Sequence, residues 1–237
     1  MKTMKIKKTA GERFFDGFNV AFLFLFTLLM LYPIVYVFAI SLSSAQAVDQ
    51  GGFFLWPRDF SLDAYKVVFS EPNMGRSYLN TVFYAFTNTF LGMAFTSMLA
   101  YALSVQDYVL KKPITVMLTI TMFISGGLIP GYLLNKALHL IDTVWVMIIP
   151  GISAYNVVLY RTFFQGNAMQ LREAAMIDGA GEFRIYLRIV TPLSIAIYAT
   201  LGLFSLVGNR NGWFGAMIYL RREELFPYQL LLRRILD

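Results

Sequence analysis

The sequence of 237 residues contains no cysteine and a single histidine, His139. The lack of cysteine excludes disulfide bonds, thiolate metal ligands and a cysteine nucleophile, and it leaves the redox compartment open. Charged residues are also scarce, at 14%, whereas soluble domains average about 25%. The chain has no G-x-x-x-x-G-K-[ST] loop, so it cannot itself be a P-loop ATPase.

Candidate catalytic groups are few as well. His139 lies in a short predicted loop without a nearby ligand set, so we interpret it as an interfacial polar residue. Glu223 and Glu224 are adjacent, and adjacent side chains point apart on a helix, so we expect a solvated face flanked by Arg221 and Arg222. We therefore predict no catalytic residue and no metal site, and we do not expect an enzyme.

Apolar side chains, by contrast, make up 57% of the chain. We predict an all-α, polytopic membrane helix bundle with five spans, at residues 20–40, 80–103, 114–134, 143–164 and 193–208. The first span exceeds the usual signal-peptide core of about 7–15 residues, so an uncleaved anchor is favoured, although Ala45-Gln46-Ala47 resembles a cleavage site. One short helix is expected in the following loop, near residues 62–69.

Two spans have distinctive compositions. The second is rich in small and hydroxyl residues, which let membrane helices approach closely, so it should pack inside the bundle; these are Thr81, Thr87, Thr89, Gly92, Thr96, Ser97, Ala100 and Ala102. The third is interrupted at Ser125-Gly126-Gly127, and breaks at membrane depth often border a substrate path. Two interpretations stay open for Gly126 and Gly127: a kinked structural helix or part of such a path.

The distribution of lysine and arginine predicts a cytoplasmic N-terminus. The interior segments then carry Lys2, Lys5, Lys7, Lys8, Arg13, Lys111, Lys112, Arg161, Arg172, Arg184 and Arg188, against Arg58, Lys66, Arg76 and Lys136 outside. The last segment departs from this rule, because it lies outside by parity and holds Arg210, Arg221, Arg222, Arg233 and Arg234. We predict a cytoplasmic basic tail (1–13), a transmembrane domain (14–208) with a cytoplasmic loop (165–192), and an extracytoplasmic or re-entrant segment (209–237).

That cytoplasmic loop contains the longest polar interruption with helical character, residues 173–192. Good helix formers start it, Asp178-Gly179 signals a turn, and helical character resumes from Glu182. Gly179 suits a turn with positive φ, and Pro192 can open the next helix. From these residues alone, a helical element that docks on a partner and an ordinary interfacial helix are both possible.

The spacing of its residues resembles a family signature. Glu173-Ala174-Ala175, then Gly179, Ile189 and Pro192, resemble the "EAA" loop (E-A-A-x3-G-x9-I-x-L-P) of permease subunits of binding-protein-dependent ABC importers. The stretches 211–217 and 225–230 are similar to the sugar and oligosaccharide members, of the maltose-permease type, and the likeness extends over residues 11–237. Thr191 stands where the family has leucine, and Arg210 stands where such permeases often carry tryptophan.

The resemblance implies the fold of a type I ABC importer permease, with six core spans, the last of which this chain would lack. It implies a bacterial cytoplasmic-membrane location and four partners: a second homologous permease subunit, an ATPase dimer, an extracellular solute-binding protein and the lipid bilayer. Nucleic acid is not among them. No cofactor is expected on this chain, since ATP and Mg would be used by the ATPase.

The resemblance also implies roles for residues. An ATPase-coupling role falls to Glu173, Ala174, Ala175, Met176, Asp178, Gly179, Ile189 and Pro192. We expect Glu173 near the helix start, where it suits the helix dipole, and an Ala174-Ala175-Met176 face that buries in the ATPase. A substrate path is predicted at Asn209, Arg210, Asn211, Trp213, Gly126 and Gly127.

The expected cargo is a sugar or oligosaccharide, and the arginine-rich last segment suggests an acidic one. Two other classes stay open. An ion-coupled secondary transporter would need a carboxylate or histidine within a span, and a membrane-embedded enzyme would need a catalytic constellation. The sequence offers neither feature.

Overall fold

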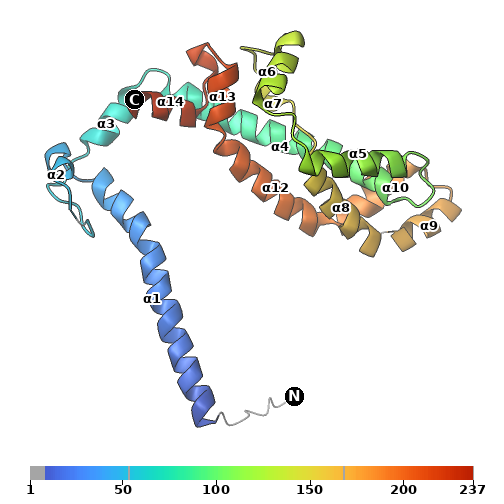
Figure 1. Ribbon diagram of the computed structural model, residues 1–237, viewed down its shortest axis with the longest axis horizontal. Coiled ribbons are helices and arrows are strands. Elements are labelled where there is room, and N and C mark those ends of the chain that lie inside the picture. Colours follow the sequence, from blue (N-terminus) through green and yellow to red (C-terminus); the bar gives the residue numbers. More distant parts are fainter. Residues whose placement is uncertain (1–8, 53, 168, 237) are drawn as a thin grey trace. The chain divides into compact units, whose positions relative to one another are not determined.

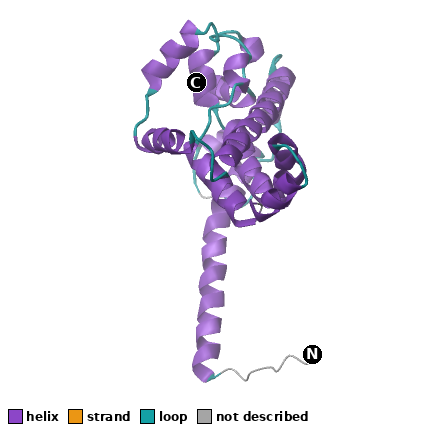
Figure 2. Ribbon diagram, turned by 90° about the vertical axis from the view of Figure 1, so that its right-hand side faces the viewer, coloured by secondary structure: helices purple, strands orange, loops and turns teal. Residues whose placement is uncertain are grey.

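The computed structural model describes residues 9–52, 54–167 and 169–236 (Figure 1). These residues form helices and loops without a β-strand, apart from one isolated bridge between Ser43 and Phe60 (Figure 2). The all-α prediction is confirmed for this part of the chain. The chain divides into two compact units, Met1–Pro72 and Asn73–Asp237.

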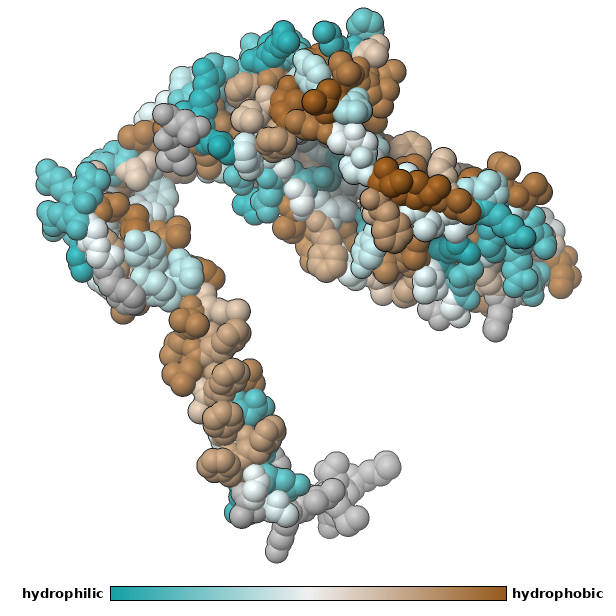
Figure 3. Space-filling view, viewed as in Figure 1, coloured by the Kyte–Doolittle hydropathy of each residue, from teal (hydrophilic) through white to brown (hydrophobic). Residues whose placement is uncertain are grey.

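The first unit contains the long helix α1 (Ala10–Ser41) and two short helices, α2 (Ala45–Asp49) and α3 (Asp63–Ser70). A capping box begins α1, because the Glu12 amide donates to Thr9 Oγ1 (3.4 Å) and the Thr9 amide donates to Glu12 Oε2 (2.7 Å). Most of the surface of α1 consists of apolar side chains, and many of them are exposed (Figure 3). Such a surface requires lipid or another subunit. The helix predicted near 62–69 is confirmed as α3.

The second unit is built around one helix, α4 (Met74–Ser104), which packs against α8 and α12. The remaining elements are α5 (Lys111–Phe123), α6 (Leu128–Ala137), α7 (Trp145–Ile148), α8 (Ala154–Asn167), α9 (Met169–Ile177), α10 (Glu182–Ile185), the π-helix η1 (Tyr186–Val190), α11 (Thr191–Leu193), α12 (Ile195–Arg210), α13 (Trp213–Tyr219), the 3-10 helix η2 (Glu223–Leu225) and α14 (Tyr228–Leu236).

The small and hydroxyl residues of α4 face its neighbours, as predicted. Thr81, Thr89, Thr96, Ser97 and Ala100 are buried, and none of the eight residues named above is exposed. At Gly92 the backbones are so close that a Cβ would lie 3.3 Å from the Pro150 Cβ. This close approach explains why the span needs small side chains.

The prediction of five spans is not confirmed. Among the described residues, two helices are long and apolar enough to cross a membrane, α1 and α4. A third candidate is the pair Glu182–Leu193 and Ile195–Arg210, which bends by 80°. The segment 114–134 is split into α5 and α6 by residues 124–127, and the segment 143–164 is split into α7 and α8 by residues 149–153. Gly126-Gly127 and Pro150-Gly151 lie at these two breaks, where helix propensity is lowest.

Candidate functional site

The helix–turn–helix predicted in residues 173–192 is present as α9, the turn at residues 178–181, and α10. Gly179 has φ of +77°, which confirms its predicted positive φ. Its amide donates to the Met176 carbonyl (3.0 Å), and the Ala180 amide donates to the Ala175 carbonyl (2.9 Å). This pair of hydrogen bonds is a Schellman C-cap, which fixes the direction of the chain after α9.

Two expectations for this helix are wrong in detail. The described part of α9 begins at Met169, one turn before Glu173, so the dipole of the helix start does not act on Glu173. Ala175 is only half exposed, because it packs against the chain's own core. The outward surface instead combines Glu173, Ala174, Met176 (47% exposed) and Ile177 (88% exposed).

Glu182, at the start of α10, ties the loop to α4. Its carboxylate accepts two hydrogen bonds from Arg172 of α9, from Nε to Oε2 (3.2 Å) and from Nη2 to Oε1. The Tyr101 hydroxyl, near the end of α4, donates to the same Oε2 (2.5 Å). The hydrogen bond from Arg172 lowers the pKa of Glu182, and it raises the pKa of Arg172.

Beyond Glu182 the loop is anchored by apolar burial. Ile185 and Val190 are fully buried, and the Tyr186 hydroxyl lies 2.7 Å from Ser97 Oγ of α4. Ile189 is half-buried against the same core. Pro192 lies in the opening positions of the short helix α11, which follows η1 without a break, and α12 begins at Ile195. The loop is therefore held on the bundle along its whole second half.

Two cavities flank these elements. One, of about 570 Å³, lies beside the loop and is mostly apolar; its walls include Met98, Tyr101, Tyr108, Arg172, Glu182 and Phe183. The other, of about 330 Å³, lies between α4, α8 and α12, and its walls include Asn88, Thr89, Asn156, Tyr160, Ser205 and Asn209. Asn209 Nδ2 donates to Asn88 Oδ1 (2.9 Å) and to Thr89 Oγ1 (3.1 Å). None of the residues lining this second cavity is charged.

Sequence comparison decides the family. No protein-family model matches the chain. It is 37% identical over 225 residues to the polygalacturonan/rhamnogalacturonan transport system permease protein YtcP of Bacillus subtilis strain 168, covering 94% of this chain and 79% of that protein. The chain belongs to the permease subunits of carbohydrate ABC importers. Protein LplC of the same strain is 36% identical, covering 96% of this permease and 77% of the relative.

A solved structure agrees with the assignment. The permease is similar to a chain in the crystal structure of a bacterial ABC transporter involved in the import of the acidic polysaccharide alginate, with a TM-score of 0.88 and 34% identity. The likeness covers 97% of this permease and 82% of that chain. The described helices thus have the fold of an ABC importer permease.

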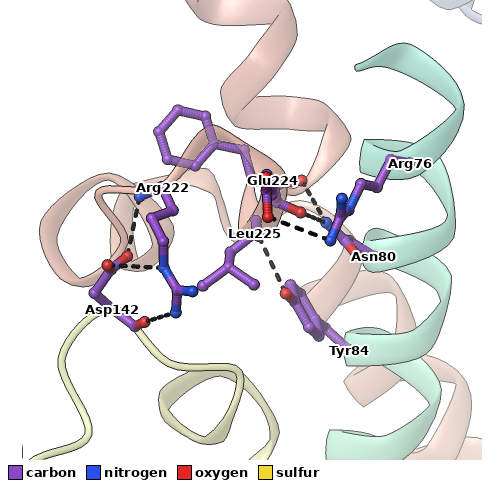
Figure 4. Close-up of polar contacts among 8 residues, drawn as sticks. Arg76, Asn80, Tyr84, Asp142, Arg222, Glu224 and Leu225 are labelled. Carbon is purple, nitrogen blue, oxygen red and sulfur yellow. Dashed lines mark hydrogen bonds and ion pairs between the residues drawn. The ribbon is translucent and has the colours of Figure 1, made fainter. Parts of the chain in front are cut away.

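At the other end of α4, polar contacts hold the segment from Leu220 to Tyr228 against the start of the helix (Figure 4). We call this segment the strap. Asp142 Oδ1 accepts from the amides of Arg221 (2.9 Å) and Arg222 (3.0 Å), and Asp142 Oδ2 accepts from Arg222 Nε (3.0 Å). Asn80 Nδ2 donates to the Glu224 carbonyl (2.8 Å). Hydrogen bonds from Arg222, of which that from its backbone amide weighs most, lower the pKa of Asp142.

The predicted substrate-path residues do not form one site. Asn209 lines the polar cavity between the helices, but Arg210, Asn211 and Trp213 do not. Trp213 is covered by the Arg233 guanidinium, 3.8 Å from its ring centroid. Gly126 and Gly127 form the break before α6, outside the residues that line either cavity. The structure therefore brings only Asn209 of this set to a polar cavity.

Sequence reasoning missed three residues of the loop's support, Tyr101, Arg172 and Glu182. The opposite charges of Arg172 and Glu182, on either side of a predicted turn, were a signal that could have found the ion pair. Nothing in the sequence pointed to Tyr101, which lies 81 positions from Glu182. Glu223 and Glu224 are solvated as predicted, but each is also paired, with Arg234 and Arg76 respectively.

Proposed function

We propose that this permease forms, with a second permease subunit, the pathway for ATP-driven uptake of a sugar or oligosaccharide delivered by an extracellular solute-binding protein. Its loop 165–192 lies in the cytoplasm and docks on an ATPase dimer, which supplies ATP hydrolysis. The residues that meet the ATPase are those of the outward surface of α9, Glu173, Ala174, Met176 and Ile177.

One observation carries the coupling role. The end of α9 presents apolar side chains to solvent, with Ile177 88% exposed, on a helix end fixed by a Schellman cap. An exposed apolar patch on a rigid element is typical of a protein–protein contact. The hydrogen-bonded Glu182 and the buried Ile185 then hold that element on the bundle.

The nature of the cargo rests on the polar cavity and on the relatives. Neutral amides and hydroxyls line the 330 Å³ cavity, and they suit the hydroxyl groups of a sugar. An acidic cargo is supported by the likeness to the alginate importer. The arginine-rich last segment supports it less than its composition suggests, because Arg222 and Arg234 are paired with Asp142 and Glu223. Arg210 and Arg221 are the arginines of that segment for which the described residues offer no ion pair.

Site-directed cross-linking tests the contact with the ATPase. The chain has no cysteine, so a single introduced cysteine is a unique site. Ile177→Cys, labelled with a thiol-reactive photo-cross-linker in the assembled transporter, should give a covalent adduct with the ATPase subunit. Val109→Cys is the matched control, because Val109 is equally exposed (89%) on a different loop.

We expect the adduct with the ATPase to form at least several times more efficiently from position 177 than from position 109. Equal or absent adducts from both positions, in a transporter that still contains the ATPase, would rule out the outward surface of α9 as its docking site. The cargo is tested separately, by measuring whether the cognate binding protein prefers acidic or neutral oligosaccharides.

A further inference from the structure

Three elements of the permease meet at one carboxylate. Glu182 starts α10, Arg172 belongs to α9, and Tyr101 lies near the end of α4. Arg172 donates from both Nε and Nη2, and Tyr101 donates to Oε2 at 2.5 Å. We call these three residues the clamp. It joins both helices of the helix–turn–helix to the central helix of the bundle.

The donors of the clamp are less exposed to water than its acceptor. The Arg172 side chain is 13% exposed and Tyr101 is 7% exposed, whereas the Glu182 side chain is 50% exposed. A guanidinium so withdrawn is stable only with a partner, and removal of that partner leaves an uncompensated charge. The pair is therefore coupled more tightly than an ordinary surface ion pair.

The turn between α9 and α10 needs such a brace. It contains Gly179 and Gly181, the most flexible residue type, and both are exposed with open space around the position of a Cβ. Without the clamp, α9 would be held only by this turn, by its connection to α8 and by two partly buried side chains, Met169 and Ala175. A force applied to the outward surface of α9 would then bend the turn instead of moving the bundle.

We propose that Tyr101 and Arg172 are positioning residues, which lock Glu182 so that a movement of α9 is passed directly to α4. The proposal rests on the coupling function proposed above and deepens it. It assigns the transmission step to three side chains and not to the packing of the loop in general. Since α4 packs against α8 and α12, a displacement at Tyr101 reaches the helices that line the polar cavity.

A role in packing alone makes a different prediction. Tyr101 also packs on Tyr186, with ring centroids 5.5 Å apart, and that contact does not need its hydroxyl. Tyr101→Phe keeps the ring and deletes only the hydrogen bond to Glu182. Tyr108→Phe is its matched control, because Tyr108 lines the same cavity and its hydroxyl makes no described hydrogen bond.

The test uses the complete transporter in proteoliposomes and measures substrate taken up per ATP hydrolysed, together with the photo-cross-link from Ile177→Cys. A charge-assisted hydrogen bond corresponds to about a tenfold change in an equilibrium constant. We expect Tyr101→Phe and Glu182→Gln each to lower the uptake per ATP by up to about tenfold, with the cross-link retained. Tyr108→Phe should leave the ratio unchanged.

A charge exchange provides a rescue. Arg172→Glu alone should lower the uptake per ATP hydrolysed. Adding Glu182→Arg should restore much of it, because the ion pair is re-formed with opposite polarity. An unchanged uptake per ATP in both Tyr101→Phe and Glu182→Gln overturns the proposed role of the clamp. A transporter that carries Ile177→Cys alone and gives no cross-link to the ATPase overturns the coupling function itself, so the two failures are distinguishable.

Discussion

At the scale of single residues, Gly179 occupies a position whose backbone conformation restricts which residues fit. Its φ of +77° is unfavourable for a side chain, yet no atom lies within 4 Å of the place where a Cβ would be. The cost of a substitution is therefore conformational and not steric. A β-branched residue at position 179 should destabilise the native turn by about 1–2 kcal/mol, which lowers its population relative to other conformations by a factor of about 5–30.

We therefore expect Gly179→Val to insert into the membrane normally and to reduce ATP-driven uptake, and Gly179→Asn to be tolerated, because asparagine adopts positive φ more readily. Gly179→Asp has nearly the shape of the asparagine variant and adds a charge, so we expect it to abolish uptake if the exposed turn meets the ATPase. Equal uptake by the aspartate and asparagine variants would argue against that contact. Uptake is compared at matched membrane levels.

The same residue shows how far sequence reasoning reaches. The turn, its positive φ and the two helices around it depend on neighbours in the chain, so Asp178-Gly179 predicted them correctly. The support of Glu182 by Tyr101 depends on packing between distant helices, and a sequence carries little local signal for such a contact. The prediction that Glu173 lies near the helix start was wrong for a related reason. The described part of the helix begins further upstream, at Met169, which packs on the core.

At the scale of elements, the strap formed by Leu220 to Tyr228 makes a pH-dependent prediction. The pKa of Asp142 is lowered below its usual value of 3.8 by the hydrogen bonds it accepts from Arg222. A carboxyl with a lowered pKa contributes stability above its usual pKa, and that contribution is lost as the pH falls through the lowered value. The strap should therefore loosen only in strong acid.

Asp142→Asn should loosen it at neutral pH, because the amide keeps one acceptor oxygen but loses the charge that binds Arg222. Limited proteolysis of the detergent-solubilised permease should then cut within residues 220–228 several times faster than in the wild type. Asp107→Asn, at an exposed carboxyl elsewhere, is the control. A cleavage rate unchanged by Asp142→Asn would show that Asn80, Tyr84 and Thr81 hold the strap without it.

Two helical stretches show why the composition of the sequence predicted continuous spans that the structure does not have. The stretches 114–134 and 143–164 are apolar enough to be counted as spans, but an average over a window does not register a break of a few residues. Gly127 has φ of +79° and residues 149–153 leave the helical conformation, so each stretch becomes two helices. The polar cavity lies next to the second break, since Pro150 and Gly151 line it. A broken helix beside a cavity is the arrangement in which irregular backbone is tolerated at membrane depth.

At the scale of the whole molecule, α4 separates two functional regions. Asn80, near its start, holds the strap, and Tyr101, near its end, holds Glu182 of the loop. These positions are 21 residues apart, which corresponds to about 30 Å along a helix, the thickness of a hydrocarbon core. A loop in the cytoplasm therefore requires the strap, with its arginines, to lie on the outer side.

This requirement conflicts with the charge rule at the last segment, so the sidedness of the permease is a decisive measurement. Leu138 (57% exposed) begins the loop that contains Asp142, the partner of Arg222 in the strap, and Val109 (89% exposed) lies in the loop after α4. Since the chain has no cysteine, each can be replaced by a single cysteine. In intact cells, a membrane-impermeant maleimide should label Leu138→Cys and should label Val109→Cys only after the membrane is opened. The reverse pattern would place loop 165–192 outside, beyond the reach of any ATPase in the cytoplasm. We expect the impermeant reagent to find the first pattern, because the charge rule gives most weight to early segments and residues 1–13 are rich in lysine.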